Sequence, residues 1–139
     1  MTTPKLQAAI ESIVDIVYAL GGISVAPDYP PDKMEVFPFL VVYPIEGRIV
    51  FGPAGVMTRL DNIVVQLHVN RKNLPIDMQR VMAYSSSIPN ALMKDPKLGA
   101  TVETFRDISY ENNYQLWANI ETFALTFTLH DVKIQEILS

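Results

Sequence analysis

Residues 120–129 read Ile-Glu-Thr-Phe-Ala-Leu-Thr-Phe-Thr-Leu and carry the strongest strand pattern in the chain. Phenylalanine and leucine alternate here with threonine and alanine, and a period of two places the apolar side chains on one face of a strand. Threonine and phenylalanine are also favoured in strands. The sequence therefore predicts a β-strand that begins as early as Tyr114, ends near Val132 and has one apolar face.

Two segments earlier in the chain also predict strands. Residues 61–70 alternate in the same way, which predicts a strand with one buried face, and its inward positions are Ile63, Val65, Leu67 and Val69. Residues 37–43 form an apolar run without alternation, which is typical of a central strand covered on both faces. Pro44 is expected to end that strand, and a short strand at 47–51 is expected to follow.

A further strand is predicted at residues 100–111, between the last helix signal and the strongest strand. Val102, Ile108 and Tyr110 are expected to point inward. Glu111, Asn112 and Asn113 are residues typical of turns, so the strand is expected to end there. Residues 26–35, which are rich in proline and charge, predict a loop.

Two segments have the periodicity of amphipathic helices. Residues 4–20 place apolar side chains on one face at steps of three and four, and Gly21 and Gly22 are expected to end this helix. Residues 75–87 predict a second helix. Pro89 cannot donate a backbone hydrogen bond, so it is expected to interrupt that helix before a short continuation or a new turn to about residue 93.

The order of these elements predicts a single α+β domain spanning residues 1–139. An antiparallel-rich mixed sheet of about four to five strands is expected to carry two helices on one face. Glycine and proline at 52–55 predict an exposed loop or hairpin tip around residues 52–59.

Composition excludes several classes of protein. The chain has 139 residues, no cysteine, 49% hydrophobic residues and a formal net charge of −4. Without cysteine there is no disulfide framework, thiolate nucleophile or cysteine-based zinc site. The sequence shows no signal-peptide pattern, and no apolar run reaches the roughly 18 residues of a membrane-spanning helix.

The polar residues do not form a recognisable catalytic motif. His68 and His130 fall on the more polar face of their predicted strands, and a site shared with Asp131 would require those strands to be adjacent. No G-x-S-x-G, G-x-G-x-x-G or P-loop pattern is present. We therefore predict no catalytic, cofactor-binding or metal-binding residues, and an enzyme ranks behind a binding or structural protein.

Charge is unevenly distributed along the chain. Residues 1–46 carry a net charge of −4, residues 47–106 carry +4, and residues 107–139 carry −4. Segments of this length often differ this much by chance, and the alternative is that complementary faces bring copies of the chain or a charged partner together. The low isoelectric point and the lack of an arginine-rich stripe argue against general nucleic-acid binding.

Two surfaces are left without an assigned partner. One is the apolar segment 49–57, which is flanked by Arg48 and Arg59. The other is the semi-polar strand face of Thr122, Ala124, Thr126 and Thr128, beside Val64 and Gln66. Either surface is explained by packing within the chain or by contact with a partner.

Several segments follow one another in a characteristic order. The opening helix leads to the proline-flanked strand Phe37-Pro38-Phe39-Leu40-Val41-Val42-Tyr43, and the alternating strand is followed by Arg71-Lys72-Asn73-Leu74. A helix ending in Ile88-Pro89-Asn90-Ala91-Leu92 precedes the aromatic strand 120–129, which closes on Val132-Lys133-Ile134. This layout resembles the tail terminator proteins of long-tailed bacteriophages, also called tail-completion or minor tail protein U-like proteins.

The resemblance implies a virion protein that assembles in the bacterial host cytoplasm into a ring, expected to be a hexamer. The ring would cap the tail tube, end its polymerisation and present a surface to the head–tail connector. Its partners would be copies of itself, the tail-tube protein and the connector protein, with no membrane, cofactor or sequence-specific nucleic acid involved. Candidate contacts with a neighbouring subunit or the tube are Arg48, Phe51, Met57 and Arg59. Candidates for a charged ring face are Arg71, Lys72 and Arg80.

Two alternatives remain at this point. Within virions, the chain is compatible with another ring of the head–tail junction or a tail-tube-like subunit. Outside virions, it is compatible with a cellular α+β module that binds a small ligand or a protein. A strictly monomeric state at high concentration would favour the second alternative.

Overall fold

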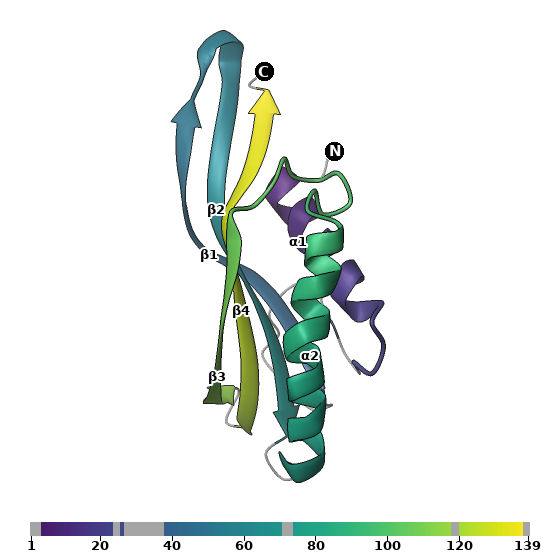
Figure 1. Ribbon diagram of the computed structural model, residues 1–139. Helices are drawn as coiled ribbons and strands as arrows, with labels where there is room; N and C mark the ends of the chain where they lie inside the picture. The colour runs from purple at the N-terminus through teal and green to yellow at the C-terminus, as the bar shows by residue number, and fades with distance from the viewer. Residues whose placement is uncertain (1–3, 24–25, 27–37, 71–73, 118–119, 138–139) are drawn as a thin grey trace.

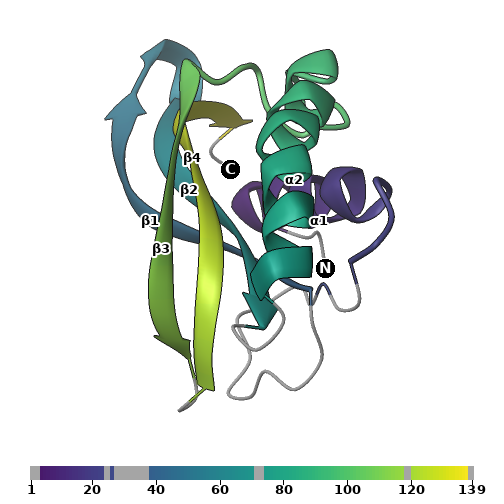
Figure 2. The same ribbon diagram turned by 60° about the horizontal axis from the view of Figure 1, so that its bottom comes forward.

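The computed structural model describes residues 4–23, 26, 38–70, 74–117 and 120–137 (Figure 1). In chain order the elements are α1 (Lys5–Tyr18), β1 (Phe39–Phe51), the short 3-10 helix η1 (Pro53–Gly55), β2 (Val56–Asn70), α2 (Leu74–Lys94), β3 (Asp107–Trp117) and β4 (Ile120–Ile137). The strands form one four-stranded sheet in the order β1-β2-β4-β3, and every neighbouring pair is antiparallel. Both helices pack on the same face of this sheet (Figure 2). The predicted α+β class is confirmed.

The face that carries the helices, called here the helix-side face, contains the residues that the alternation placed inward. Its buried positions on β2 and β4 are Ile63, Val65, Leu67, Val69, Phe123, Leu125, Phe127 and Leu129. Because Leu67 pairs with Leu125 and Val65 with Phe127, the apolar stripes of the two central strands meet side by side. This stripe and the two helices make the core.

Helix α1 follows its predicted amphipathic pattern. Its buried residues are Ala9, Ile10, Ile13, Val14 and Val17, which recur at helical spacing. Gly21 and Gly22 follow the helix with φ of 82° and 78°, a left-handed conformation that costs glycine little. The prediction for this helix and its end is confirmed.

Helix α2 runs without interruption to Lys94, so the predicted break at Pro89 is wrong. Proline removes one backbone donor and crowds the preceding turn. Ile88 and Leu92, on either side of Pro89, are wholly buried in the core. Their packing against the sheet holds the helix together where local propensity alone would end it.

Strand β1 is an edge strand, so its predicted central position is wrong. Residues 39–42 are nevertheless buried on both faces. The apolar run at residues 39–42 therefore predicts that these residues are buried, but not where the strand lies in the sheet. Pro44 also does not end the strand, because β1 passes an irregularity between Pro44 and Glu46 and takes in the strand predicted at 47–51. The predicted loop at 26–35 lies outside the described residues, Ala26 excepted.

Strand β3 begins later and ends later than predicted. Residues 111–113 pair with β4 instead of forming a turn, and Tyr114 belongs to β3 rather than to the last strand. Val102 is buried and Ile108 half-buried as expected, but Tyr110 is exposed. Tyr110 lies on the helix-side face opposite Phe127, at a sheet edge that the helices leave uncovered.

Two bulges face each other across β2 at Asn62. Ile45 and Glu46 of β1 lie opposite Asn62 on one side, and His130 and Asp131 of β4 lie opposite it on the other. Asp131 has φ of 53°, a left-handed conformation that aspartate tolerates better than most residues. Because bulges bend strands and increase their twist, the sheet changes direction at this level.

Candidate functional site

Beyond the two bulges, three strands continue as a projection that we call the arm. It consists of residues 45–51 of β1, the turn at 52–55, residues 56–62 of β2 and residues 131–137 of β4. Figure 1 shows the β1–β2 hairpin extending beyond both helices. Gly52 donates its backbone N–H to the Val56 carbonyl at 2.7 Å, which closes the hairpin. The predicted loop at 52–59 is thus a tight turn, and residues 56–59 belong to β2.

The outermost strand of the arm exposes large apolar side chains. Phe51 is 72% exposed, and Ile45, Ile49 and Val50 are each about half exposed. Four such residues lie within seven positions of an edge strand, with Ile49 and Phe51 on one face and Val50 on the other, and exposed apolar side chains on an edge strand are common at protein interaction sites. The apolar segment singled out in the sequence is therefore exposed at the end of the sheet rather than packed in the core.

The two faces of the arm differ in their charged residues. Ile49, Phe51, Met57 and Arg59 lie on the helix-side face, as do the buried Val132 and Ile134 with which β2 pairs. Arg48 lies on the opposite face, called here the outer face, in register with Leu60 and Lys133.

Arg59 is neutralised within the chain. Its Nε lies 3.2 Å from Oδ2 of Asp61, a residue that is only 6% exposed. Gly47 pairs with Asp61 across the β1–β2 ladder. A Cβ atom at position 47 would collide with the Asp61 carboxylate and would lie 2.8 Å from the Leu60 carbonyl oxygen. The arm therefore contains a half-buried ion pair between Arg59 and Asp61, and the absence of a side chain at Gly47 leaves room for the Asp61 carboxylate.

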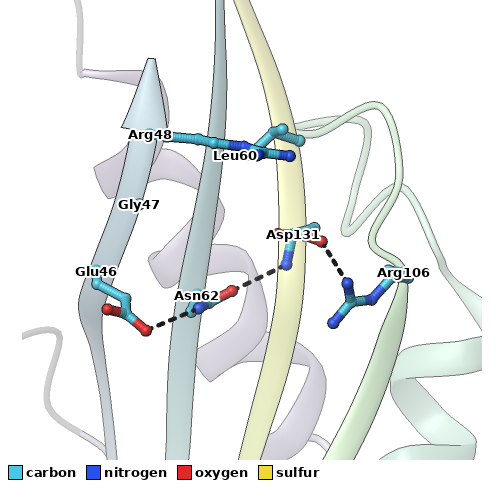
Figure 3. A pocket seen from close by; sticks show the side chains of 7 residues that line it. All are labelled: Glu46, Gly47, Arg48, Leu60, Asn62, Arg106 and Asp131. Atoms are coloured by element: carbon cyan, nitrogen blue, oxygen red, sulfur yellow. Dashed lines mark hydrogen bonds and ion pairs between the residues drawn. The ribbon is translucent and has the colours of Figure 1, made fainter. Parts of the chain in front are cut away.

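Arg48 has no ion pair with the residues that the structure describes. It lines an open pocket of about 310 Å³ at the base of the arm, together with Glu46, Gly47, Leu60, Asn62, Arg106 and Asp131. Figure 3 shows the Arg48 side chain lying across β2 over Leu60. Its charge is available to an acidic partner, because the acidic groups nearby are engaged elsewhere.

A polar network at the floor of this pocket holds the two bulges. The Asn62 side chain donates to a Glu46 carboxylate oxygen at 3.4 Å and accepts the backbone N–H of Asp131 at 3.0 Å (Figure 3). The Asp131 carboxylate forms an ion pair with Arg106 at 3.0 Å. One side chain thus ties β2 to both neighbouring strands where they depart from regular pairing.

The structure brings together some of the predicted contact residues and separates others. Arg48, Phe51, Met57 and Arg59 all lie in the arm. Arg80 is exposed on α2, a different element on the helix side of the sheet. Arg71 and Lys72 lie outside the described residues.

A second exposed apolar strip, on β3, was missed by the sequence reasoning. Tyr110, Tyr114 and Leu116 are 58–68% exposed on the helix-side face. The Tyr110 ring lies 6.1 Å from that of Phe127, and the Tyr114 ring 5.3 Å from that of Phe123. Alternation of Tyr110, Asn112 and Tyr114 was the available signal, but Glu111-Asn112-Asn113 was interpreted as a turn.

The histidines do not form a shared site. His68 pairs with Ala124, whereas His130 lies at the bulge opposite Asn62, six positions away along β2. His130 Nε2 lies 2.8 Å from the Ser109 hydroxyl. Within the described part of the chain, no three His, Asp or Glu side chains are grouped closely enough to hold a metal ion.

The semi-polar face of β2 and β4 is buried within the single chain. His68 and Thr122 are 0% exposed, and Gln66 and Val64 are each 5% exposed. The prediction that residues 61–70 have only one buried face is therefore wrong. His68 Nε2 donates to the Gln66 side-chain oxygen at 3.1 Å, and the Thr122 hydroxyl donates to Nδ1 at 2.8 Å. Burial lowers the pKa of His68 to about 4, so the ring is neutral at pH 7.

Comparison of the sequence with protein-family models and with curated proteins finds no match to either. Neither helix among the described residues has the length and hydrophobicity needed to cross a bilayer. The geometry of the arm, the pocket at its base and the two sheet edges is therefore the basis for assigning a role.

Proposed function

We propose that this chain is a structural subunit of a bacteriophage tail, a tail terminator that assembles into a ring, caps the tail tube, ends its polymerisation and provides the surface that joins the head. The exposed apolar arm is the observation that best supports this role. A projecting edge strand with four exposed apolar side chains suits contact with a neighbouring subunit or with the tube.

Ring assembly is compatible with the distribution of surface features. A ring joins two different patches of each subunit, so every subunit must carry both. The arm supplies one candidate patch, and the exposed strip of β3, at the opposite edge of the sheet, supplies another. Arg48 supplies a positive charge without an ion pair among the described residues. The proposed partners are copies of the chain, the tube protein and the head–tail connector protein.

The proposed role requires no catalysis, cofactor or metal. It depends on complementary surfaces and on a fold that stays rigid when they meet. The site of action would be the virion tail, after assembly in the host cytoplasm. The six-subunit ring remains an expectation from the resemblance.

Light scattering after size-exclusion chromatography, over a wide range of protein concentrations, tests the assembly. We expect a discrete oligomer that negative-stain electron microscopy shows as rings of one size. Tubes of indefinite length would instead indicate a tail-tube-like subunit. A chain that remains monomeric at the highest concentration, and that also fails to bind preformed tail tubes, would contradict the proposal.

A pair of variants links that measurement to the arm. Phe51→Ser removes the most exposed apolar side chain of the arm, and Met82→Ser removes a comparably exposed one from α2. We expect only the first substitution to reduce ring formation. If both variants form rings to the same extent, the arm does not belong to the interface between subunits.

A further inference from the structure

Among the described residues, no strand pairs with the outer side of either edge strand of the sheet. In the order β1-β2-β4-β3, each outer strand uses one side for pairing, and no described strand occupies the other side. An unpaired edge presents backbone donors and acceptors that template pairing with a further strand. Here both edges also expose large apolar side chains, on the arm of β1 and on β3.

The directions of the strands allow copies to join head to tail. Every neighbouring pair in the four-stranded sheet is antiparallel, so β1 and β3 run in opposite directions. A second copy placed beside the first, without turning it over, brings its β3 antiparallel to β1 of the first. The alternation of strand direction then continues across the junction, and each face of one sheet continues into the same face of the next.

The side chains on the two edges match face by face. On the helix-side face, Ile49 and Phe51 of the arm would meet Tyr110 and Ile108 of β3. On the outer face, the arm carries Arg48 and β3 carries Glu111, which pairs with Thr126. Neither charged side chain forms an ion pair with the described residues. Head-to-tail pairing thus joins apolar with aromatic groups on one face and a cation with an anion on the other.

We propose that the arm of β1 in one copy pairs antiparallel with β3 of the next copy, with Arg48 opposite Glu111, Ile49 opposite Tyr110 and Phe51 opposite Ile108. This inference rests on the proposed function, because it names the two surfaces that build the ring. The arm lies beyond the bulges, whereas β3 pairs with β4 before them, so neighbouring copies are offset along the strands. A sheet that continues through all copies and closes into a barrel needs a stagger between its strands, which this offset would supply.

A symmetric dimer through β1 fits the same surfaces less well. Pairing β1 with itself places Arg48 on the same outer face as Arg48 of the second copy. It also leaves Tyr110, Tyr114 and Leu116 uncovered in both copies. Only the heterologous arrangement places apolar residues of the arm and of β3 in one interface.

Charge exchange tests the pairing of Arg48 with Glu111. We expect Arg48→Glu or Glu111→Arg alone to weaken association about tenfold or more, since like charges then oppose each other across the interface. The double variant on one chain should recover most of that loss. Lys97→Glu, a charge reversal at an exposed position after α2, is the control and should leave association unchanged. A double variant that associates no better than either single variant overturns the pairing.

The chain contains no cysteine, so a single introduced cysteine is the only thiol that a cross-linker can react with. Ile49→Cys and Asn112→Cys place thiols on the helix-side face of the two edges. When the two singly substituted chains are mixed with a short bis-maleimide, we expect cross-links between position 49 of one chain and position 112 of the other.

The outcomes separate this inference from the proposed function. Rings of one size that give only 49-to-49 cross-links, or none, overturn the edge pairing and leave the ring itself standing. A chain that neither forms oligomers nor binds preformed tail tubes overturns both.

Discussion

The stability of the fold should fall as the pH is lowered from 7.5 to 5.0, because His68 is buried as a neutral ring. Its pKa is lowered from 6.5 to about 4 by burial, and its two nitrogens are engaged by the neutral side chains of Gln66 and Thr122. Phe39 and Ala124, which pair with it in the ladder, carry no charge. The described side chains next to the ring thus offer no anion to stabilise its protonated form.

The direction of this pH dependence follows from the proton affinities of His68 in the folded and the unfolded chain. Below pH 6.5 the unfolded chain binds a proton at His68, whereas the folded chain does so only near pH 4, so acid favours unfolding. The stability contribution is fully present above about pH 6.5 and is lost as the pH falls to 4. The complete shift corresponds to about 3 kcal/mol, of which about 2 kcal/mol is lost between pH 7.5 and 5.0.

Urea unfolding followed by circular dichroism at pH 7.5, 6.5, 5.5 and 5.0 measures this effect. We expect His68→Gln, which cannot titrate, to remove about 2 kcal/mol of the pH dependence relative to the natural chain. His130→Gln removes the other histidine and should leave the His68 contribution in place. If the natural chain and His68→Gln lose stability in parallel between pH 7.5 and 5.0, the assignment of a neutral buried ring is wrong.

Three further substitutions test the arm. Asn62→Ala removes the hydrogen bonds that join both bulges and should lower the free energy of unfolding by about 1–2 kcal/mol, measured by urea unfolding. Gly47→Ala places a methyl group against Asp61 and should cost about 1–3 kcal/mol in the same assay, and an unchanged midpoint would disprove the close packing there. Phe51→Ser should change stability by less than about 0.5 kcal/mol while weakening self-association; a large loss of stability would show that Phe51 packs within its own chain.

Much of the sheet was predictable because strand alternation is a local property. The period of two identified the inward positions that the core uses within residues 63–69 of β2 and within residues 123–129 of β4. The same pattern did not show that Gln66 and His68 are also buried. Polar side chains on a strand usually face solvent, and the hydrogen bonds from Thr122 and to Gln66 help to make burial of His68 tolerable.

The candidate site was predictable in part. Arg48, Phe51, Met57 and Arg59 were selected from the sequence, and the structure places all of them in one projecting arm. Sequence did not distinguish the two arginines. Arg59 is neutralised by Asp61, two positions along the same strand, whereas Arg48 faces the other side of the arm and lacks an ion pair with the described residues.

By itself, the sequence determined the secondary structure types, the apolar face of each central strand and the α+β class. Those properties follow from periodicity, which depends on residues close together in the chain. Only the tertiary structure decided that β1 and β3 are the edges, that two bulges meet at Asn62, and that α2 continues through Pro89. These features depend on which distant segments pair and pack, because exposure of a strand or the persistence of a helix is set by its neighbours in space.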